Sequence, residues 1–236
     1  PAHDDRHASL SVSRGREGRA LLHCHAGCSP MEVCQALGLP LRSLFPPDSL
    51  DRGPGRIIAA YDYRDAEGRL LFQAVRLQPK DFRQRRPDGN GGWLWSLDRT
   101  PRVLYRLPEL QAADPADWVF VVEGEKDADN LAALGMAATS NPMGAGNWSQ
   151  LSDDSPLHGR RVAILPDKDV AGRKHARDVA ARLAGHAVEL KVIELPGDGK
   201  DVSDWIEAGG TADGLRDLID SAPAWSDSDV RRGRPS

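Results

Sequence analysis

The chain has 236 residues, of which 40% are hydrophobic and 28% are charged. This size and composition indicate a globular protein with one full-sized domain and a smaller one, and they exclude a peptide hormone or a disordered tail. No apolar run approaches the roughly 18 residues of a membrane-spanning helix, and the N-terminus lacks a signal-peptide pattern, so we expect a cytoplasmic protein with no membrane partner. Because the first residue is Pro1 rather than Met, we expect the sequence to be a fragment.

The net charge of −4 conceals a difference between the two halves of the chain. Residues 1–110 contain 17 Lys and Arg against 13 Asp and Glu, whereas residues 111–236 contain 14 against 22. A basic front half and an acidic rear half fit a nucleic-acid contact surface joined to a cation-binding catalytic centre. Ordinary solvated surfaces explain a difference of this size equally well.

The first 45 residues are expected to form a small module of their own. Its three cysteines are Cys24, Cys28 and Cys34. They are too few for a disulfide framework, and the close pair indicates a metal site. The Ser-Pro pair at 29–30 predicts the start of a helix that ends near Gly38 and carries Cys34 as a core thiol. Prolines and glycines in 46–56 predict a linker.

Residues 57–115 are expected to form a β-rich basic segment. Two strands, 57–63 and 69–77, flank the turn signal of 65–68 and predict a β-hairpin. The polar, glycine-rich stretch 80–95 is expected to be a loop that leads into short strands at 93–97 and 102–105.

The expected loop combines basic and aromatic side chains: Lys80, Arg83, Arg85, Arg86, Phe82, Trp93 and Trp95. Basic side chains neutralise phosphates, and aromatic rings stack on unpaired bases of any sequence. We therefore expect the loop to bind single-stranded nucleic acid. The alternative is a solvated loop with its tryptophans in the core.

From Trp118 onward the pattern alternates between strands and helices. Apolar runs predict buried strands at 118–122, 161–165 and 188–195, and helical patterns follow at 126–134, 171–184, 202–208 and 212–219. Such alternation predicts an α/β, Rossmann-like domain with a mainly parallel sheet and right-handed crossovers, here over 116–221. The last segment, 222–236, is expected to be disordered.

Acidic residues follow each of the three predicted strands. They are Glu123, Glu125, Asp127, Asp167, Asp169, Asp201 and Asp204. In an open α/β sheet, active sites lie outside the carboxyl ends of the strands. Clustered carboxylates repel one another unless a cation lies among them, and oxygen ligands favour Mg²⁺ or Mn²⁺. A single acid is more often a helix cap, but capping does not explain acids at all three strand ends.

The segments EGEKDADNL and, about forty residues later, PDKDVAG resemble the two signature motifs of the Toprim domain. Primases of the bacterial type, type IA and II topoisomerases and some nucleases share this domain. The third segment, GKDVSDW, resembles the primase branch. The resemblance covers roughly residues 118–210.

The resemblance implies roles for individual residues. Glu123 is the implied general acid/base, with Asp127 and Lys126 in the catalytic set; Asp167 and Asp169 are the implied Mg²⁺ or Mn²⁺ ligands, with Asp201 in support; and Lys168 and Lys200 are implied phosphate contacts. For each lysine, simple neutralisation of neighbouring acids is an equal alternative.

The N-terminal segment PAHDDRHASLSV…LLHCHAGCSP is similar to the zinc ribbon of primases from phages and mobile elements. This similarity implies that His3, Cys24 and Cys28 are ligands of a structural Zn²⁺, with a cysteine just before Pro1 as the expected fourth ligand. Without that cysteine we expect this chain to hold zinc weakly or not at all. The three residues between Cys24 and Cys28 fall within the spacing of structural zinc sites.

Together these features predict a primase-like Toprim protein of a phage, plasmid or integrated element. It would synthesise short RNA primers on single-stranded DNA from nucleoside triphosphates, using Mg²⁺ or Mn²⁺. We expect a replicative helicase or other ATPase domain as a fused or separate partner, although the sequence itself has no Walker-type motif. The alternatives are a Toprim nuclease, a topoisomerase-like strand-cleaving enzyme, or a catalytically silent nucleic-acid-binding module of a replication or defence complex.

Overall fold

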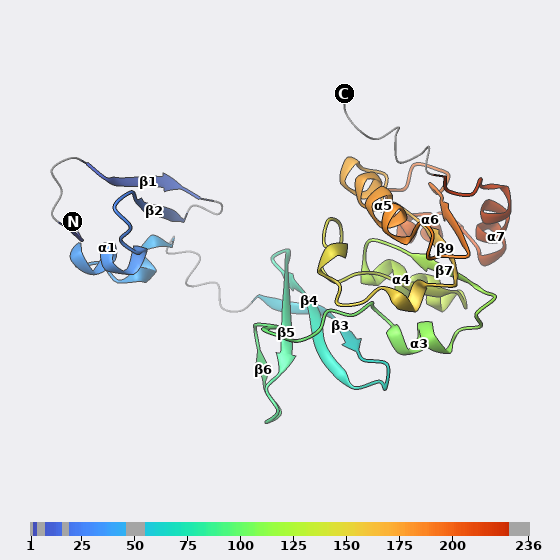
Figure 1. The fold of residues 1–236 in the computed structure, drawn as a ribbon, viewed down its shortest axis with the longest axis horizontal. Helices are drawn as coiled ribbons and strands as arrows, with labels where there is room; N and C mark the ends of the chain where they lie inside the picture. Colours follow the sequence, from blue (N-terminus) through green and yellow to red (C-terminus); the bar gives the residue numbers. More distant parts are fainter. Residues whose placement is uncertain (1, 4–7, 16–18, 46–54, 227–236) are drawn as a thin grey trace. The chain divides into compact units, whose positions relative to one another are not determined.

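The computed structural model describes residues 2–3, 8–15, 19–45 and 55–226. The chain divides into two compact units, Pro1–Arg56 and Ile57–Ser236, which are described separately (Figure 1). Most of the expected linker, 46–56, lies outside the described residues. In the described part, no helix is long and apolar enough to cross a membrane.

The first unit is a β-hairpin followed by a helix. Strands β1 (Leu10–Arg14) and β2 (Ala20–Cys24) pair antiparallel, and α1 (Pro30–Ala36) and a 3₁₀ turn (Leu41–Leu44) follow. The predicted helix start is confirmed, because Ser29 caps α1 and Glu32 completes a capping box. Cys34 is buried on this helix, as expected.

The second unit begins with an antiparallel sheet. Its strands, in spatial order, are β3 (Arg56–Arg64), β4 (Leu70–Gln78), β5 (Asp81–Pro87) and β6 (Trp93–Leu94). The hairpin of β3 and β4 is confirmed.

Two expectations for this segment are wrong. The expected loop 80–95 contains β5, which pairs with β4 in the register Gln73↔Arg85, whereas β6 confirms the start of the short strand expected at 93–97. The polar side chains of β5 hide this strand in the sequence, but its backbone groups are satisfied by the β4 neighbour. The expected strand at 102–105 is irregular chain, whose Tyr105 N–H donates to the Ser140 carbonyl rather than to a ladder.

A four-stranded parallel sheet follows. Its strands, in spatial order, are β10 (Glu189–Val192), β9 (Arg161–Ile164), β7 (Trp118–Val121) and β8 (Ala137–Thr139). The helices are α3 (Leu107–Ala112), α4 (Glu125–Ala133), α5 (Val170–Leu183), α6 (Val202–Glu207) and α7 (Ala212–Ser221). The expected α/β class with a mainly parallel sheet is confirmed, whereas β8 and α3 are additions that the sequence patterns did not predict.

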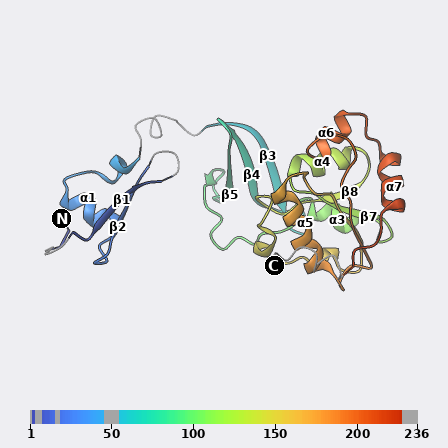
Figure 2. The ribbon, with the colours of Figure 1, turned by 90° about the horizontal axis from the view of Figure 1, so that it is seen from above.

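Helices cover both faces of the parallel sheet (Figure 2). Alternate residues of a strand point to opposite faces. Val119 and Val121 of β7 therefore join the core with α3 and α5, whereas Phe120 and Val122 join the core with α4, α6 and α7. This three-layer packing fixes the sheet and leaves its carboxyl edge free for the acidic loops.

The expected disorder of the tail, 222–236, is wrong for its first residues. The Trp225 N–H donates to the Leu190 carbonyl on β10 at 2.7 Å, and its ring packs against the core that contains α5. Residues 227–236 lie outside the described residues.

Candidate active site

The register of the parallel sheet brings the acidic segments to one edge. Val121 of β7 and Val192 of β10 both pair with Ile164 of β9, so the three strands end at the same level. The chain then passes directly to Glu123 after β7 and to Asp167 after β9. The segment after β10 is drawn to the same edge because the Lys168 N–H donates to the Lys200 carbonyl at 2.9 Å.

Glu123 is a half-buried carboxylate without a hydrogen-bond partner at one oxygen. Its Oε2 is buried and accepts no hydrogen bond in the described part of the chain. Burial, followed by the negative charges of Asp167 and Asp169, raises the pKa of Glu123 to about 7. A carboxyl group with this pKa can both take and give a proton near neutral pH.

Lys200 joins the two aspartates that follow β9. Its Nζ lies 3.0 Å from Oδ2 of Asp167 and 3.4 Å from Oδ2 of Asp169. Burial raises the pKa of Asp167 although Lys200 opposes that effect, and the hydrogen bond with Asp167 raises the pKa of Lys200. The structure therefore brings together three predicted site residues, with two carboxylates beside one ammonium group.

Asp169 and Gly172 shape the start of α5 around Asp167. Asp169 caps the helix by accepting the Gly172 N–H at 2.8 Å, and this bond is the largest effect that lowers the pKa of Asp169. A Cβ on Gly172 would lie 2.5 Å from the Asp167 carbonyl oxygen. Only glycine allows the helix to approach the acidic loop this closely.

Asp127 and Asp201 are engaged in helix contacts. Oδ1 of Asp127 accepts the Ser203 N–H at 2.9 Å and the Ser203 hydroxyl at 2.5 Å, and burial raises the pKa of Asp127 to about 6. Asp201 caps α6 by accepting the Asp204 N–H at 2.9 Å. Both acids therefore have structural partners at the N-termini of α4 and α6, beside any role in chemistry.

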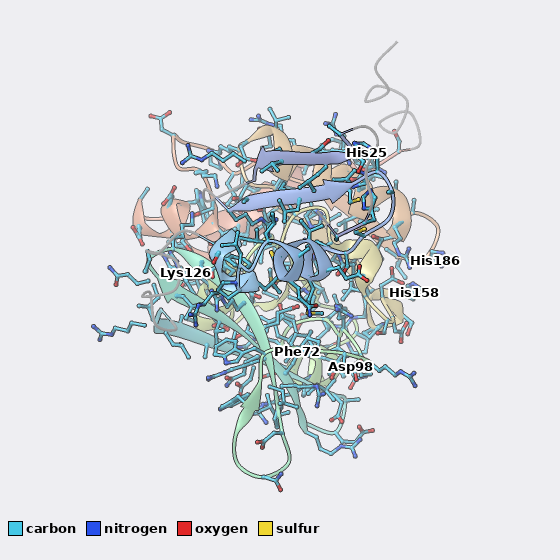
Figure 3. The ribbon with its side chains drawn as sticks, turned by 90° about the vertical axis from the view of Figure 1, so that its left-hand side faces the viewer. His25, Phe72, Asp98, Lys126, His158 and His186 are labelled. Carbon is cyan, nitrogen blue, oxygen red and sulfur yellow. The ribbon has the colours of Figure 1, made fainter. Side chains whose placement is uncertain are left out.

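The other two lysines contact groups outside the carboxylate cluster. Lys126, labelled in Figure 3, is exposed on α4 and lies 3.8 Å from Oε1 of Glu207. The Lys168 ammonium donates to the Gly197 carbonyl. The structure thus brings only Lys200 of the three predicted lysines into an ion pair with the aspartates after β9.

The donor set of this edge fits a hydrated Mg²⁺ or Mn²⁺. Within the described ranges, the acids do not bring three ligand atoms within 4.8 Å of one another. Mg²⁺, however, keeps several waters and needs only one or two carboxylates together with substrate phosphates. Asp167 and Asp169, which already share one cationic group, provide that pair, and the unpartnered Oε2 of Glu123 belongs to the same electrostatic cluster.

A second metal-binding set lies in the first unit. His3, Cys24 and Cys28 place their ligand atoms within 4.8 Å of one another, and Nδ1 of His3 lies 3.1 Å from Sγ of Cys28 and 3.8 Å from Sγ of Cys24. Zn–S and Zn–N bonds in a tetrahedron imply N–S separations of about 3.5 Å. Backbone hydrogen bonding, foremost from Cys28, lowers the pKa of Cys24 to about 7, whereas burial and the neighbouring Cys24 raise the pKa of Cys28, so Cys24 is the thiol that favours the metal-binding thiolate. The predicted zinc residues therefore form a set that can hold a metal.

Some of the predicted basic and aromatic side chains contact neighbouring residues of the antiparallel sheet, and others are exposed. The Arg85 guanidinium lies 4.0 Å from the Trp93 ring centroid and 5.6 Å from that of Trp95. Arg83 pairs with Asp81 at 2.8 Å. Lys80 is an exposed turn residue, and Arg86 on β5 is partly buried.

A cavity of about 300 Å³ lies beside β5. It is lined by Phe82, Arg83, Gln84, Trp95, Ser96, Leu97, Arg102 and Met143. Phe82 and Trp95 are exposed for large hydrophobic residues, at 44% and 46%. The sequence patterns predicted Arg83 and Trp95 as part of this surface but missed Arg102 and Met143. The positive charge of Arg102 was the signal that could have indicated it, whereas nothing in the sequence indicated Met143.

No protein-family model matches the chain. No curated protein matches it either.

Solved structures, in contrast, resemble the chain. The primase of Aquifex aeolicus, solved with its zinc-binding and RNA polymerase domains, matches 73% of this chain at 22% identity and a TM-score of 0.53. A DNA primase domain from Pseudomonas aeruginosa matches 73% of the chain at 22% identity and a TM-score of 0.51. The chain spans 42% and 54% of these two chains, respectively. The fold therefore resembles that of solved DNA primase domains, and the predicted resemblance is confirmed at the level of fold.

Proposed function

We propose that the chain is a DNA primase, which synthesises short RNA primers on single-stranded DNA with Mg²⁺ or Mn²⁺. The observation that carries this proposal is the carboxylate cluster at the sheet edge, where Glu123 has a pKa of about 7 beside the Asp167 and Asp169 pair. The primase-type fold supports the same reading. We also propose that 57–115 binds the template and 116–221 carries catalysis.

In this proposal each residue at the carboxyl edge of the parallel sheet has a separate role. Glu123 accepts the proton of the attacking 3′-hydroxyl, because its pKa leaves it about half ionised near pH 7. Asp167 and Asp169 hold the divalent cation, which supplies charge neutralisation for the triphosphate when bound. Lys200 keeps these two acids in place and is a cation that the triphosphate can contact.

The cavity beside β5 is the proposed template surface. Phe82 and Trp95 offer exposed aromatic rings on which unpaired bases can stack, and Arg83 and Arg102 offer charge to the backbone phosphates. The Arg85 guanidinium is engaged with Trp93 and with the Gln73 carboxamide at 2.8 Å, so we assign it to holding the aromatic rings.

The remaining proposals rest on the sequence. Residues 1–45 form a zinc-binding module that contributes to DNA binding, with His3, Cys24 and Cys28 as its metal ligands. A helicase or ATPase is the proposed partner, and a phage or mobile element the proposed origin.

The proposed function predicts metal-dependent primer synthesis. With a single-stranded DNA template, labelled nucleoside triphosphates and Mg²⁺ or Mn²⁺, the wild type should produce short RNA. Asp167→Asn should reduce the rate at least about a hundredfold, because it removes a charge from the proposed cation site. Asp178→Asn is the matched control, since Asp178 on α5 pairs with Lys174 at the surface, and it should retain the wild-type rate.

Other products of the same assay identify the alternatives. Metal-dependent cleavage of the template without primer would indicate a nuclease. DNA binding with neither reaction would indicate a catalytically silent module.

A second prediction concerns the pH dependence of stability. Since the pKa of Glu123 is about 7 in the folded chain and 4.5 is its ordinary value, the folded state binds the extra proton between these two pH values. The free energy of unfolding therefore falls as the pH rises from 4.5 to 7, and the full penalty remains above pH 7. Glu123→Gln should remove this penalty. The increase in the free energy of unfolding over the wild type should be about 1 to 2 kcal/mol larger at pH 8 than at pH 5, after allowance for solvent screening.

The measurement is urea unfolding of both variants at pH 5 and pH 8 without added divalent metal. Glu67→Gln, which changes a largely exposed carboxylate, is the control and should show no pH-dependent gain. A gain for Glu123→Gln that is equal at both pH values would show that Glu123 keeps an ordinary pKa.

A third prediction concerns the template surface. Arg83→Ala combined with Arg102→Ala should weaken binding to single-stranded DNA and reduce the slope of log K against log salt by about 1.4, at about 0.7 for each phosphate contact. Arg69→Ala, at the far turn of the same hairpin sheet, is the control for lost charge. Fluorescence anisotropy across a salt series measures both. An unchanged slope in the double variant would place DNA contact elsewhere.

The fourth prediction concerns the first unit. Protein incubated with Zn²⁺ should bind the metal through these three ligands, as elemental analysis measures, and Cys24→Ser combined with Cys28→Ser should abolish that binding. Cys34→Ser should keep the metal, because Cys34 is buried on α1 and lies outside the ligand set. Stoichiometric zinc in the Cys24 and Cys28 double variant would contradict the assignment.

A further inference from the structure

Two residues that each carry a buried polar atom without a partner line one small cavity next to the carboxylate cluster. Oε2 of Glu123 and Nε2 of His175 both lack a hydrogen-bond partner in the described part of the chain. Both residues line a cavity of about 10 Å³ at the ends of β7 and β9, whose other walls are mostly apolar. His175 lies on α5 and is only 5% exposed. A buried polar group without a partner is costly, so the pairing of two such groups around one space requires an explanation.

The hydrogen bond on the other ring nitrogen fixes which atom of His175 carries the proton. The backbone N–H of Gly146 donates to Nδ1 at 3.2 Å. Nδ1 is therefore an acceptor, and a neutral imidazole must carry its proton on Nε2. Burial lowers the pKa of His175, which favours this neutral form. His175 thus offers a donor to the cavity, and Glu123 offers an acceptor.

The volume of the cavity indicates how Glu123 and His175 are connected. A volume of about 10 to 15 Å³ holds one water molecule, and such a water needs two or more polar partners. The apolar walls leave Glu123, His175 and the adjacent Asp167 as the polar side chains that line this space. We propose that His175 is a positioning residue that holds the Glu123 carboxylate through one bridging water, with Nε2–H donating to the water and the water donating to Oε2.

This arrangement also assigns a task to the loop after β8. Gly146 orients His175, and two residues earlier Gly144 packs against Glu123, since a Cβ on Gly144 would lie 3.6 Å from Cγ of Glu123. The loop therefore constrains the acid from one side directly and from the other side through the imidazole. The hydrogen-bond part of the inference is independent of the reaction, and only its catalytic consequence rests on the proposed function.

Nuclear magnetic resonance of the full chain labelled with ¹⁵N-histidine tests the hydrogen bond without any assay of activity. We expect His175 to be the neutral tautomer with its proton on Nε2, and we expect this proton to exchange slowly with water. Glu123→Gln should shift the Nε2–H resonance by more than Glu125→Gln does, since the Glu125 carboxylate is bonded to Tyr63 at 2.7 Å instead. A proton on Nδ1, an imidazolium, or equal shifts in the two variants would overturn the proposal.

Two substitutions of His175 separate positioning from packing. His175→Asn keeps an acceptor near the position of Nδ1 but removes the donor at Nε2, whereas His175→Gln carries an amide N–H close to the Nε2 position. In primer synthesis we expect His175→Asn to lose about tenfold in kcat with unchanged KM for the nucleotide, and His175→Gln to stay within about threefold of the wild type. Equal losses in both variants, or a change confined to KM, would show a packing role only.

The two kinds of failure can be told apart. A wild type that makes no primer contradicts the proposed function and leaves the resonance of His175 to decide the hydrogen bond. If the His175 variants do not fold, the spectra of the wild type, Glu123→Gln and Glu125→Gln decide the proposal by themselves.

Discussion

The mutual repulsion of carboxylates at one edge of a parallel sheet governs this structure. Because the strands end at the same level, each loop that follows delivers an acid to the same place. Burial raises the pKa values of Glu123 and Asp167, and neighbouring negative charges raise them further. Lys200 offsets part of this repulsion by lying within 3.4 Å of both aspartates that follow β9.

The hydrogen bonds that assemble this edge connect segments far apart in the chain. Asp127 on α4 accepts two bonds from Ser203 on α6, and the backbone of Lys168 bonds that of Lys200. The antiparallel sheet is attached in the same manner, because the Tyr63 hydroxyl donates to Glu125. Several acids of the first motif are therefore structural ties as well as candidate site residues. Substituting one of them tests folding and chemistry together, which is why Asp127 is a poor probe of mechanism.

The sequence was sufficient to predict the parts of the fold in which the apolar pattern and the positions of the acidic residues indicate the same structure. The strands near 118–122 and 161–165 and the three acidic strand ends follow from continuous apolar runs that stop at carboxylates. Strand β5 was missed because Asp81 and the arginines of this strand are typical of a solvated loop. A neighbouring strand nevertheless satisfies their backbone groups. His175 was missed for a different reason. Its neighbours Gly146 and Glu123 are distant in sequence, so only the tertiary structure reveals the shared cavity.

The loop after β8 connects the two halves of the proposed chemistry. Met143 lines the basic and aromatic cavity beside β5, Gly144 packs against Glu123, and Gly146 orients His175. Met143 and both glycines have positive φ angles, so the backbone of this loop is confined to a conformation that few residues adopt. Residues 143–146 therefore contact both the cavity beside β5 and the residues that surround Glu123.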